Sequence, residues 1–141
     1  MSGPRLLLID DEDAFRETLD KLLTHRGFEV STASDGAQGM RAVLLGGIEV
    51  VVLDVKMPGL DGIETLRELK RIQPDLEVII LTGHLLKSTE EEGLKLGAFA
   101  YLTKPCTVLD LVITVGAALE LRAQRQANPG SPGALAVRPA S

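Results

Sequence analysis

The chain has 141 residues, 45% of them hydrophobic, and a formal net charge of −5. This length and apolar content suit one domain with one core, and an acidic chain lacks the clustered Lys and Arg that bind nucleic acid. The single cysteine excludes an intramolecular disulfide, no signal-peptide pattern opens the sequence, and no apolar run approaches the roughly 20 residues that cross a bilayer. We therefore expect a cytoplasmic protein with neither a nucleic-acid nor a membrane partner.

Short apolar runs alternate with helical patterns along the chain. Runs rich in Val, Ile and Leu predict buried strands at 5–9, 49–53, 76–81 and 99–102, and a more alternating run predicts an edge strand at 28–33. Apolar residues at helical spacing lie between the runs, and glycines stand where helices should end. Asp61 and Ser88, each followed three residues later by Glu, predict capping boxes, and Thr107 opens the last helix.

This alternation predicts an α/β domain. Five βα units require a parallel sheet with right-handed crossovers and helices on both faces, which is a doubly wound fold. From Gln124 onward the composition changes to Asn, Pro, Gly, Ser and Ala without a helical or strand period. We therefore predict one domain over residues 1–123 and a disordered tail, or a truncated linker to an output domain, over residues 124–141.

Polar residues follow four of the predicted strands. Asp10 and Asp11 follow the first strand, Asp54 the third, Thr82 the fourth and Lys104 the fifth. In an open α/β sheet, ligands bind at the carboxyl ends of the strands, where the strand order reverses. We therefore expect these five side chains to meet at one edge of the sheet.

Three carboxylates at one place predict a cation, because they repel one another unless protons or a cation neutralise them. Oxygen ligands without histidine favour Mg²⁺ over zinc, and we predict Asp11 and Asp54 as direct ligands and Asp10 as a ligand through water. Lys104 would neutralise the remaining charge of a transferring phosphoryl group. The predicted chemistry is phosphoryl transfer to a carboxylate nucleophile. In the alternative, structural interpretation, Asp10 and Asp11 cap the first helix.

Residues 5–122 resemble the bacterial receiver domains of the CheY-like family. The matching segments are LLLIDDE at 6–12, DVKMPGLDG at 54–62, LTG at 81–83 and GAFAYLTKP at 97–105. The resemblance implies a flavodoxin-like sheet of order 2-1-3-4-5 and a phosphoryl group on Asp54, taken from a histidine kinase or a histidine phosphotransfer protein. It also implies a magnesium ligand from the backbone carbonyl of Lys56 and a cis peptide bond between Lys104 and Pro105.

The resemblance further implies a switch. The hydroxyl of Thr82 would hydrogen-bond the phosphoryl group, and the ring of Tyr101 would turn inward behind it. The surface formed by the fourth helix, fifth strand and fifth helix would then change its preference for a target, an output domain or a second copy in a homodimer. Alternatively, Tyr101 is an ordinary strand residue with its hydroxyl in water. Lys56 and His84 vary among receivers, and we expect them to tune the lifetime of the phosphoaspartate.

Other functions compete with this one. A haloacid-dehalogenase-type phosphatase also uses an aspartate nucleophile with Mg²⁺, but it needs a second acid two residues later, where this chain has Lys56. A pseudo-receiver that is never phosphorylated typically loses the acidic pair or the lysine, and both are present here. The chain is also compatible with the receiver part of a transcription factor or a hybrid kinase. On the favoured interpretation, the protein catalyses only its own phosphorylation and dephosphorylation and is not otherwise an enzyme.

Overall fold

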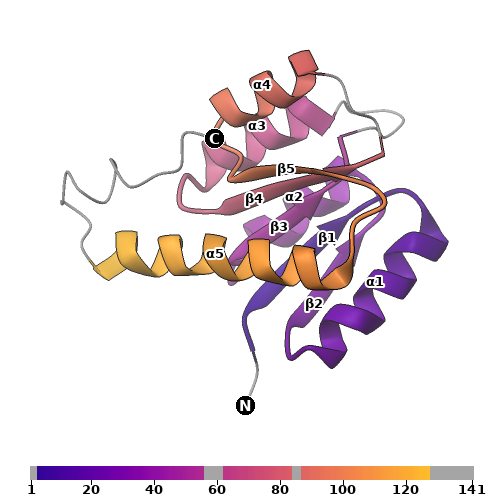
Figure 1. The fold of residues 1–141 in the computed structure, drawn as a ribbon. Coiled ribbons are helices and arrows are strands. Elements are labelled where there is room, and N and C mark those ends of the chain that lie inside the picture. Colours follow the sequence, from indigo (N-terminus) through magenta and orange to yellow (C-terminus); the bar gives the residue numbers. More distant parts are fainter. Residues whose placement is uncertain (1–2, 56–61, 84–86, 128–141) are drawn as a thin grey trace.

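A computed structural model describes residues 3–55, 62–83 and 87–127 as a five-stranded parallel sheet with helices on both faces (Figure 1). Across the sheet the order is β2-β1-β3-β4-β5, which confirms the predicted doubly wound fold. The strands are β1 (Arg5–Ile9), β2 (Glu29–Ala33), β3 (Val50–Leu53), β4 (Glu77–Thr82) and β5 (Ala100–Thr103). The helices are α1 (Asp13–His25), α2 (Gly36–Leu44), α3 (Gly62–Ile72), α4 (Lys87–Lys95) and α5 (Val108–Ala127).

Alternate residues of the central strands build two separate cores, because successive side chains of a strand point to opposite faces of a sheet. One core lies under α2, α3 and α4, and its members from the three central strands are Leu7, Ile9, Val51, Leu53, Val78 and Ile80. The other lies under α1 and α5, and its strand members are Leu6, Leu8, Val50, Val52, Ile79 and Leu81. Strands that are apolar on both faces must be covered on both faces, so β1, β3 and β4 occupy the centre of the sheet.

Two helix starts follow ordinary capping chemistry. The side chain of Asp35 accepts a hydrogen bond from the backbone N–H of Gln38 at the start of α2, at 2.8 Å. The hydroxyl of Thr107 accepts one from the N–H of Asp110 at the start of α5, at 3.0 Å. The predicted cap at Ser88 is wrong, since α4 already begins at Lys87. Lysine is a good helix former, so the helix extends one residue in front of the serine. Asp61 lies outside the described residues.

The last helix is longer than the composition of the chain predicts. It continues to Ala127, past the domain boundary predicted at residue 123. Gln, Arg and Ala are good helix formers, and Arg125 also forms an ion pair with the fully buried carboxylate of Glu77. Residues 124–127 therefore belong to the folded domain. Residues 128–141 of the predicted tail lie outside the described residues.

None of the helices in the described part of the chain combines the length and the apolar character that a membrane span requires.

Gly62 allows α3 to start directly against the strand that leads to Asp54. A Cβ atom at Gly62 would lie 2.2 Å from the Cα and 2.6 Å from the carbonyl oxygen of Val55, the residue after Asp54. Because the obstacle is backbone, the loop would have to move. We expect Gly62→Ala to lower the free energy of unfolding by about 1–3 kcal/mol, measured by urea denaturation.

The matched control is Gly116→Ala. Gly116 is exposed in the middle of α5, and a Cβ there would meet nothing within 4 Å. Alanine should therefore raise the free energy of unfolding by about 0.5–1 kcal/mol, because it has the better helix propensity. Equal stabilities of Gly62→Ala and the wild type would contradict the close approach of α3 to Val55.

Candidate functional site

Backbone hydrogen bonds just beyond the strand ends position the residues of the site. The N–H of Asp10 donates to the last carbonyl of β2 at 3.1 Å, and the N–H of Asp54 donates to the last carbonyl of β1 at 3.0 Å. The N–H of Lys104 donates to the last carbonyl of β4 at 2.9 Å. These bonds continue the ladders of the sheet, so all three backbones are held at its carboxyl edge.

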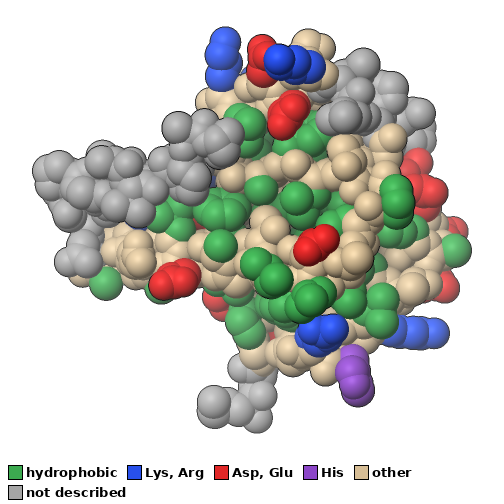
Figure 2. All heavy atoms as spheres, in the orientation of Figure 1, with side chains coloured by type: hydrophobic (Ala, Val, Ile, Leu, Met, Phe, Trp, Pro, Cys, Tyr) green, Lys and Arg blue, Asp and Glu red, His purple; other side chains and the backbone are tan. Residues whose placement is uncertain are grey.

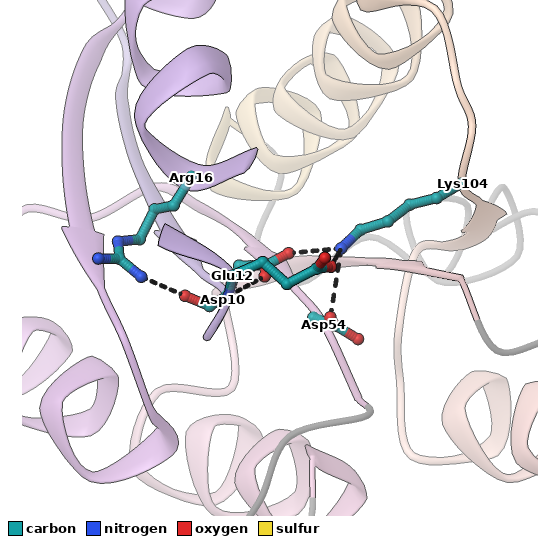
Figure 3. A network of polar contacts seen from close by, with 5 residues as sticks. All are labelled: Asp10, Glu12, Arg16, Asp54 and Lys104. Atoms are coloured by element: carbon teal, nitrogen blue, oxygen red, sulfur yellow. Dashed lines mark hydrogen bonds and ion pairs between the residues drawn. The ribbon is translucent and has the colours of Figure 1, made fainter. Parts of the chain in front are cut away.

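The ammonium of Lys104 joins three carboxylates at this edge (Figure 3). Its Nζ atom lies 2.8 Å from Oδ2 of Asp10, 2.9 Å from Oε1 of Glu12 and 3.3 Å from Oδ2 of Asp54. The ring of Phe15 lies 4.0 Å from Nζ, measured to the ring centroid, in a cation–π contact. Each of the three acids offers a carboxylate oxygen, and these oxygens lie within 4.8 Å of one another. The predicted convergence on one edge therefore includes Asp10, Asp54 and Lys104.

The members of this group differ in exposure. The side chains of Asp10 and Asp54 are 2% and 5% exposed, that of Lys104 is 13% exposed and that of Glu12 is 63% exposed. Buried charges are stable only when they are paired, so the two aspartates depend on the ammonium far more than Glu12 does. A single ammonium leaves three carboxylates with excess negative charge. The site therefore favours the binding of a further cation.

Burial and pairing act in opposite directions on the pKa values here. Burial raises the pKa of Asp10, against the hydrogen bonds that Asp10 accepts from Lys104 and from the N–H of Glu12. Burial would lower the pKa of Lys104, but hydrogen bonds to Asp10 and Glu12 and the nearby charge of Asp54 raise it. The hydrogen bond from Lys104 lowers the pKa of Glu12. The lysine therefore carries its charge throughout the physiological pH range.

The turn before α1 directs Asp10 into the site rather than onto the helix. Oδ1 of Asp10 accepts the N–H of Glu12 at 2.9 Å, and Glu12 is the N-cap residue of α1 in extended conformation. No side chain caps this helix. Arg16 braces the turn, because its guanidinium donates to the carbonyl oxygen of Asp10 at 2.8 Å and to Asp13 at 2.7 Å. The structural alternative for Asp10, a helix cap, is therefore wrong.

Asp11 does not join the three carboxylates that meet, although it was predicted as a direct ligand. It is half-buried, and Glu12 occupies the third place in the group. Glu12 was not among the predicted site residues, although it stands directly after the acidic pair. Lys56 and His84 lie outside the described residues.

Thr82 and Tyr101 lie on the neighbouring strands β4 and β5. Thr82 is the last residue of β4 and fully buried, and it pairs in register with Thr103 of β5. Tyr101 is half-buried and packs against the core under α2, α3 and α4. The peptide bond between Lys104 and Pro105 is cis, the conformation expected from the resemblance. Thr82 and Lys104 therefore lie at the carboxyl ends of neighbouring strands, and Tyr101 lies two residues before the end of β5.

The chain is a doubly wound parallel sheet with acids and a lysine at its carboxyl edge. These features place it in the class of α/β domains that bind ligands at this edge. Comparison with known families identifies the class further. The chain belongs to the response regulator receiver domain family, whose model matches residues 6–115. It is thus a receiver domain of the two-component type.

Individual relatives agree with this assignment. The transcriptional regulatory protein PrrA of Mycobacterium leprae is 37% identical over 122 residues, which cover 86% of this chain and 52% of PrrA. The chain spans about half the length of such curated relatives.

Solved structures of response regulators match the fold over most of the chain. A response regulator receiver domain protein from Clostridium thermocellum has 40% sequence identity and a TM-score of 0.82, and the match covers 86% of this chain and 98% of that one. A response regulator from Burkholderia pseudomallei, with a phosphorylated aspartic acid, a calcium ion and citrate, has 28% identity and a TM-score of 0.76. That match covers 91% of this chain and 74% of the other.

Proposed function

We propose that this chain is the phosphoacceptor switch of a two-component signalling system and that Asp54 is the residue phosphorylated. The observation that carries the proposal is the nearly buried carboxylate of Asp54 at the end of β3, paired with the ammonium of Lys104 at 3.3 Å. The phosphorylated aspartic acid of the Burkholderia relative supports it. We place the protein in the cytoplasm, where a histidine kinase or a histidine phosphotransfer protein donates the phosphoryl group.

Asp54 acts as the nucleophile. One of its carboxylate oxygens forms a bond to phosphorus while the P–N bond to the imidazole of the donor breaks, and the imidazole leaves with the electron pair and takes up a proton. Lys104 offsets the charge on the transferring oxygens, and the hydroxyl of Thr82 donates to one of them. Water later attacks phosphorus, which regenerates Asp54 and releases inorganic phosphate. The domain therefore catalyses only its own phosphorylation and dephosphorylation.

The donor set fits Mg²⁺. Asp10, Glu12 and Asp54 offer hard carboxylate oxygens close together, and the Burkholderia relative contains calcium, another cation that prefers oxygen ligands. When bound, Mg²⁺ supplies positive charge that offsets the repulsion between the carboxylates and the phosphoryl oxygens. We propose that Asp10 and Asp54 hold it together with Asp11, which follows Asp10 directly but does not join the three acids that meet in this structure, and with the backbone carbonyl of Lys56, outside the described residues. Because the ammonium of Lys104 contacts Asp10 and Asp54, a cation held by these two acids would compete with the lysine for their oxygens.

The surface of α4, β5 and α5 transmits the signal. Leu109 and Ile113 of α5 are 53% and 61% exposed, and Figure 2 shows apolar side chains gathered on the face that α5 and β5 present. A phosphoryl group adds about −1.5 to −2 charges and three acceptor oxygens near Thr82, next to the strand that carries Tyr101. The surface then changes its affinity for a downstream target, for an output domain like those of transcriptional regulators, or for a second copy of the chain.

Phosphorylation can be tested by intact mass spectrometry. After incubation with Mg²⁺ and acetyl phosphate, the wild type should gain the mass of one phosphoryl group, and Asp54→Asn should gain nothing. EDTA should prevent the gain in the wild type. A wild-type chain that stays unmodified with acetyl phosphate, phosphoramidate and a panel of histidine kinases would rule out the proposed function.

A further inference from the structure

Glu12 is the exposed partner of a lysine that also serves two buried acids. An ammonium has three N–H donors, and Lys104 directs one to each of Asp10, Glu12 and Asp54. Its donors are therefore all in use before any ligand arrives. The two buried acids are also among the proposed metal ligands, whereas the Glu12 carboxylate lies on the solvent side of the group with a side chain 63% exposed.

The contacts around Glu12 and Lys104 place the two residues next to each other. The backbone of Glu12 is fixed on both sides, because its N–H donates to Asp10 at 2.9 Å and its carbonyl accepts the N–H of Arg16 at 2.9 Å. The Phe15 ring lies against the same ammonium at 4.0 Å. The neighbouring acid, Asp13, pairs instead with Arg16. Glu12 is thus the one acid of this turn that reaches Lys104 from the solvent side.

We propose that Glu12 is a positioning residue that keeps the ammonium of Lys104 at the site when Asp10 and Asp54 turn to a bound divalent cation. The inference rests on the proposed function and deepens it. Without metal, Lys104 has three carboxylate partners. With metal bound, two of them are engaged elsewhere, and the contact with Glu12 holds the lysine ready for the phosphoryl oxygens.

The direction of the effect follows from this exchange of partners. Removing the charge of Glu12 leaves Lys104 with Asp10 and Asp54 in the metal-free protein but with neither in the metal-bound protein. The loss therefore favours the metal-free arrangement. We expect Glu12→Gln to raise the Kd for Mg²⁺ roughly 3- to 5-fold, the upper part of the range for an ion pair with an exposed partner.

The experiment is a titration with MgCl₂ followed by the backbone amide signals of Asp54 and Val55 in ¹H–¹⁵N NMR spectra, which needs no phosphorylation. Glu17→Gln is the matched control, because it removes one charge from an exposed position of α1 without touching Lys104 or the turn that carries Asp10. Its Kd should stay within about twofold of wild type, the change expected for an exposed charge. Glu12→Asp, which keeps the charge but shortens its reach, should fall between wild type and Glu12→Gln.

A double-mutant cycle with Lys104→Met decides whether Glu12 acts through the lysine. In the Lys104→Met background, Glu12→Gln should change the Kd by less than about twofold. If it still weakens binding by the full factor, Glu12 is a direct ligand or acts through its charge alone, and the proposal is overturned. It is also overturned if Glu12→Gln binds Mg²⁺ like the wild type.

The wild type separates the two proposals. If it binds Mg²⁺ but takes no phosphoryl group, the proposed function alone is refuted. If it does neither, both proposals are refuted.

Discussion

Replacing Lys104 by methionine is expected to slow the transfer of a phosphoryl group from acetyl phosphate to Asp54 by about 100-fold, the usual effect of removing one preorganised charge donor. Methionine keeps an unbranched apolar side chain that still packs against the ring of Phe15, while the ammonium is lost. Charge then develops on the phosphoryl oxygens next to unneutralised carboxylates. The rate is measured from the growth of the phosphorylated mass at a fixed, saturating Mg²⁺ concentration.

Two controls separate this effect from a loss of structure or metal. Lys95→Met removes an exposed lysine from the last turn of α4 and should leave the rate within about twofold of wild type. Lys104→Met itself should bind Mg²⁺ at least as tightly as the wild type, because the metal no longer competes with an ammonium. A variant that binds Mg²⁺ well and is phosphorylated at the wild-type rate would exclude the charge-neutralising role of Lys104.

The geometry of parallel sheets explains why so much of the site could be predicted. Asp10, Asp54, Thr82 and Lys104 each follow or end a strand, and parallel strands bring their carboxyl ends to one edge. Apolar character on both faces identified the three central strands as readily, but it also predicted a buried strand at 99–102, where β5 is a half-buried edge strand. The order of the strands, in contrast, came from the resemblance to receiver domains, because hydrophobic period alone does not say which strand lies next to which.

The choice between Asp11 and Glu12 could not be read from spacing. Which of two adjacent acids reaches Lys104 depends on the turn before α1, where Glu12 takes the extended N-cap conformation and Arg16 braces the backbone of Asp10. That turn is set by contacts between residues of the folded chain. A glutamate also has one methylene more than an aspartate, which lets an exposed residue reach the largely buried ammonium of Lys104.

The ion pair between Glu77 and Arg125 could not be predicted from the sequence, for a similar reason. Glu77 interrupts an apolar run, and in a strand pattern such an acid normally faces water. Arg125 lies in a segment whose composition resembles a tail. Their contact is visible only after β4 and α5 have packed, and it places a charged pair at the end of the sheet opposite the candidate site. The same contact makes the end of α5 part of the domain.

Arg125→Met is therefore expected to lower the free energy of unfolding by about 3–5 kcal/mol near pH 7.5, because it leaves the carboxylate of Glu77 buried without its cation. Glu77 is fully buried, so water cannot replace the guanidinium without opening the packing of α5 on β4. The change is a large fraction of the 5–15 kcal/mol that is typical of domain stability, and it should appear as a Tm lowered by roughly 10–20 °C in thermal unfolding followed by circular dichroism.

The double variant Glu77→Met/Arg125→Met shows whether the loss comes from the orphaned charge. Apolar residues of similar volume often replace a buried ion pair without loss, so the double variant should recover most of the stability that Arg125→Met loses. If single and double variants unfold alike, the contribution of Arg125 is the packing of its stem. In that case, α5 would be held to the sheet by apolar contacts alone.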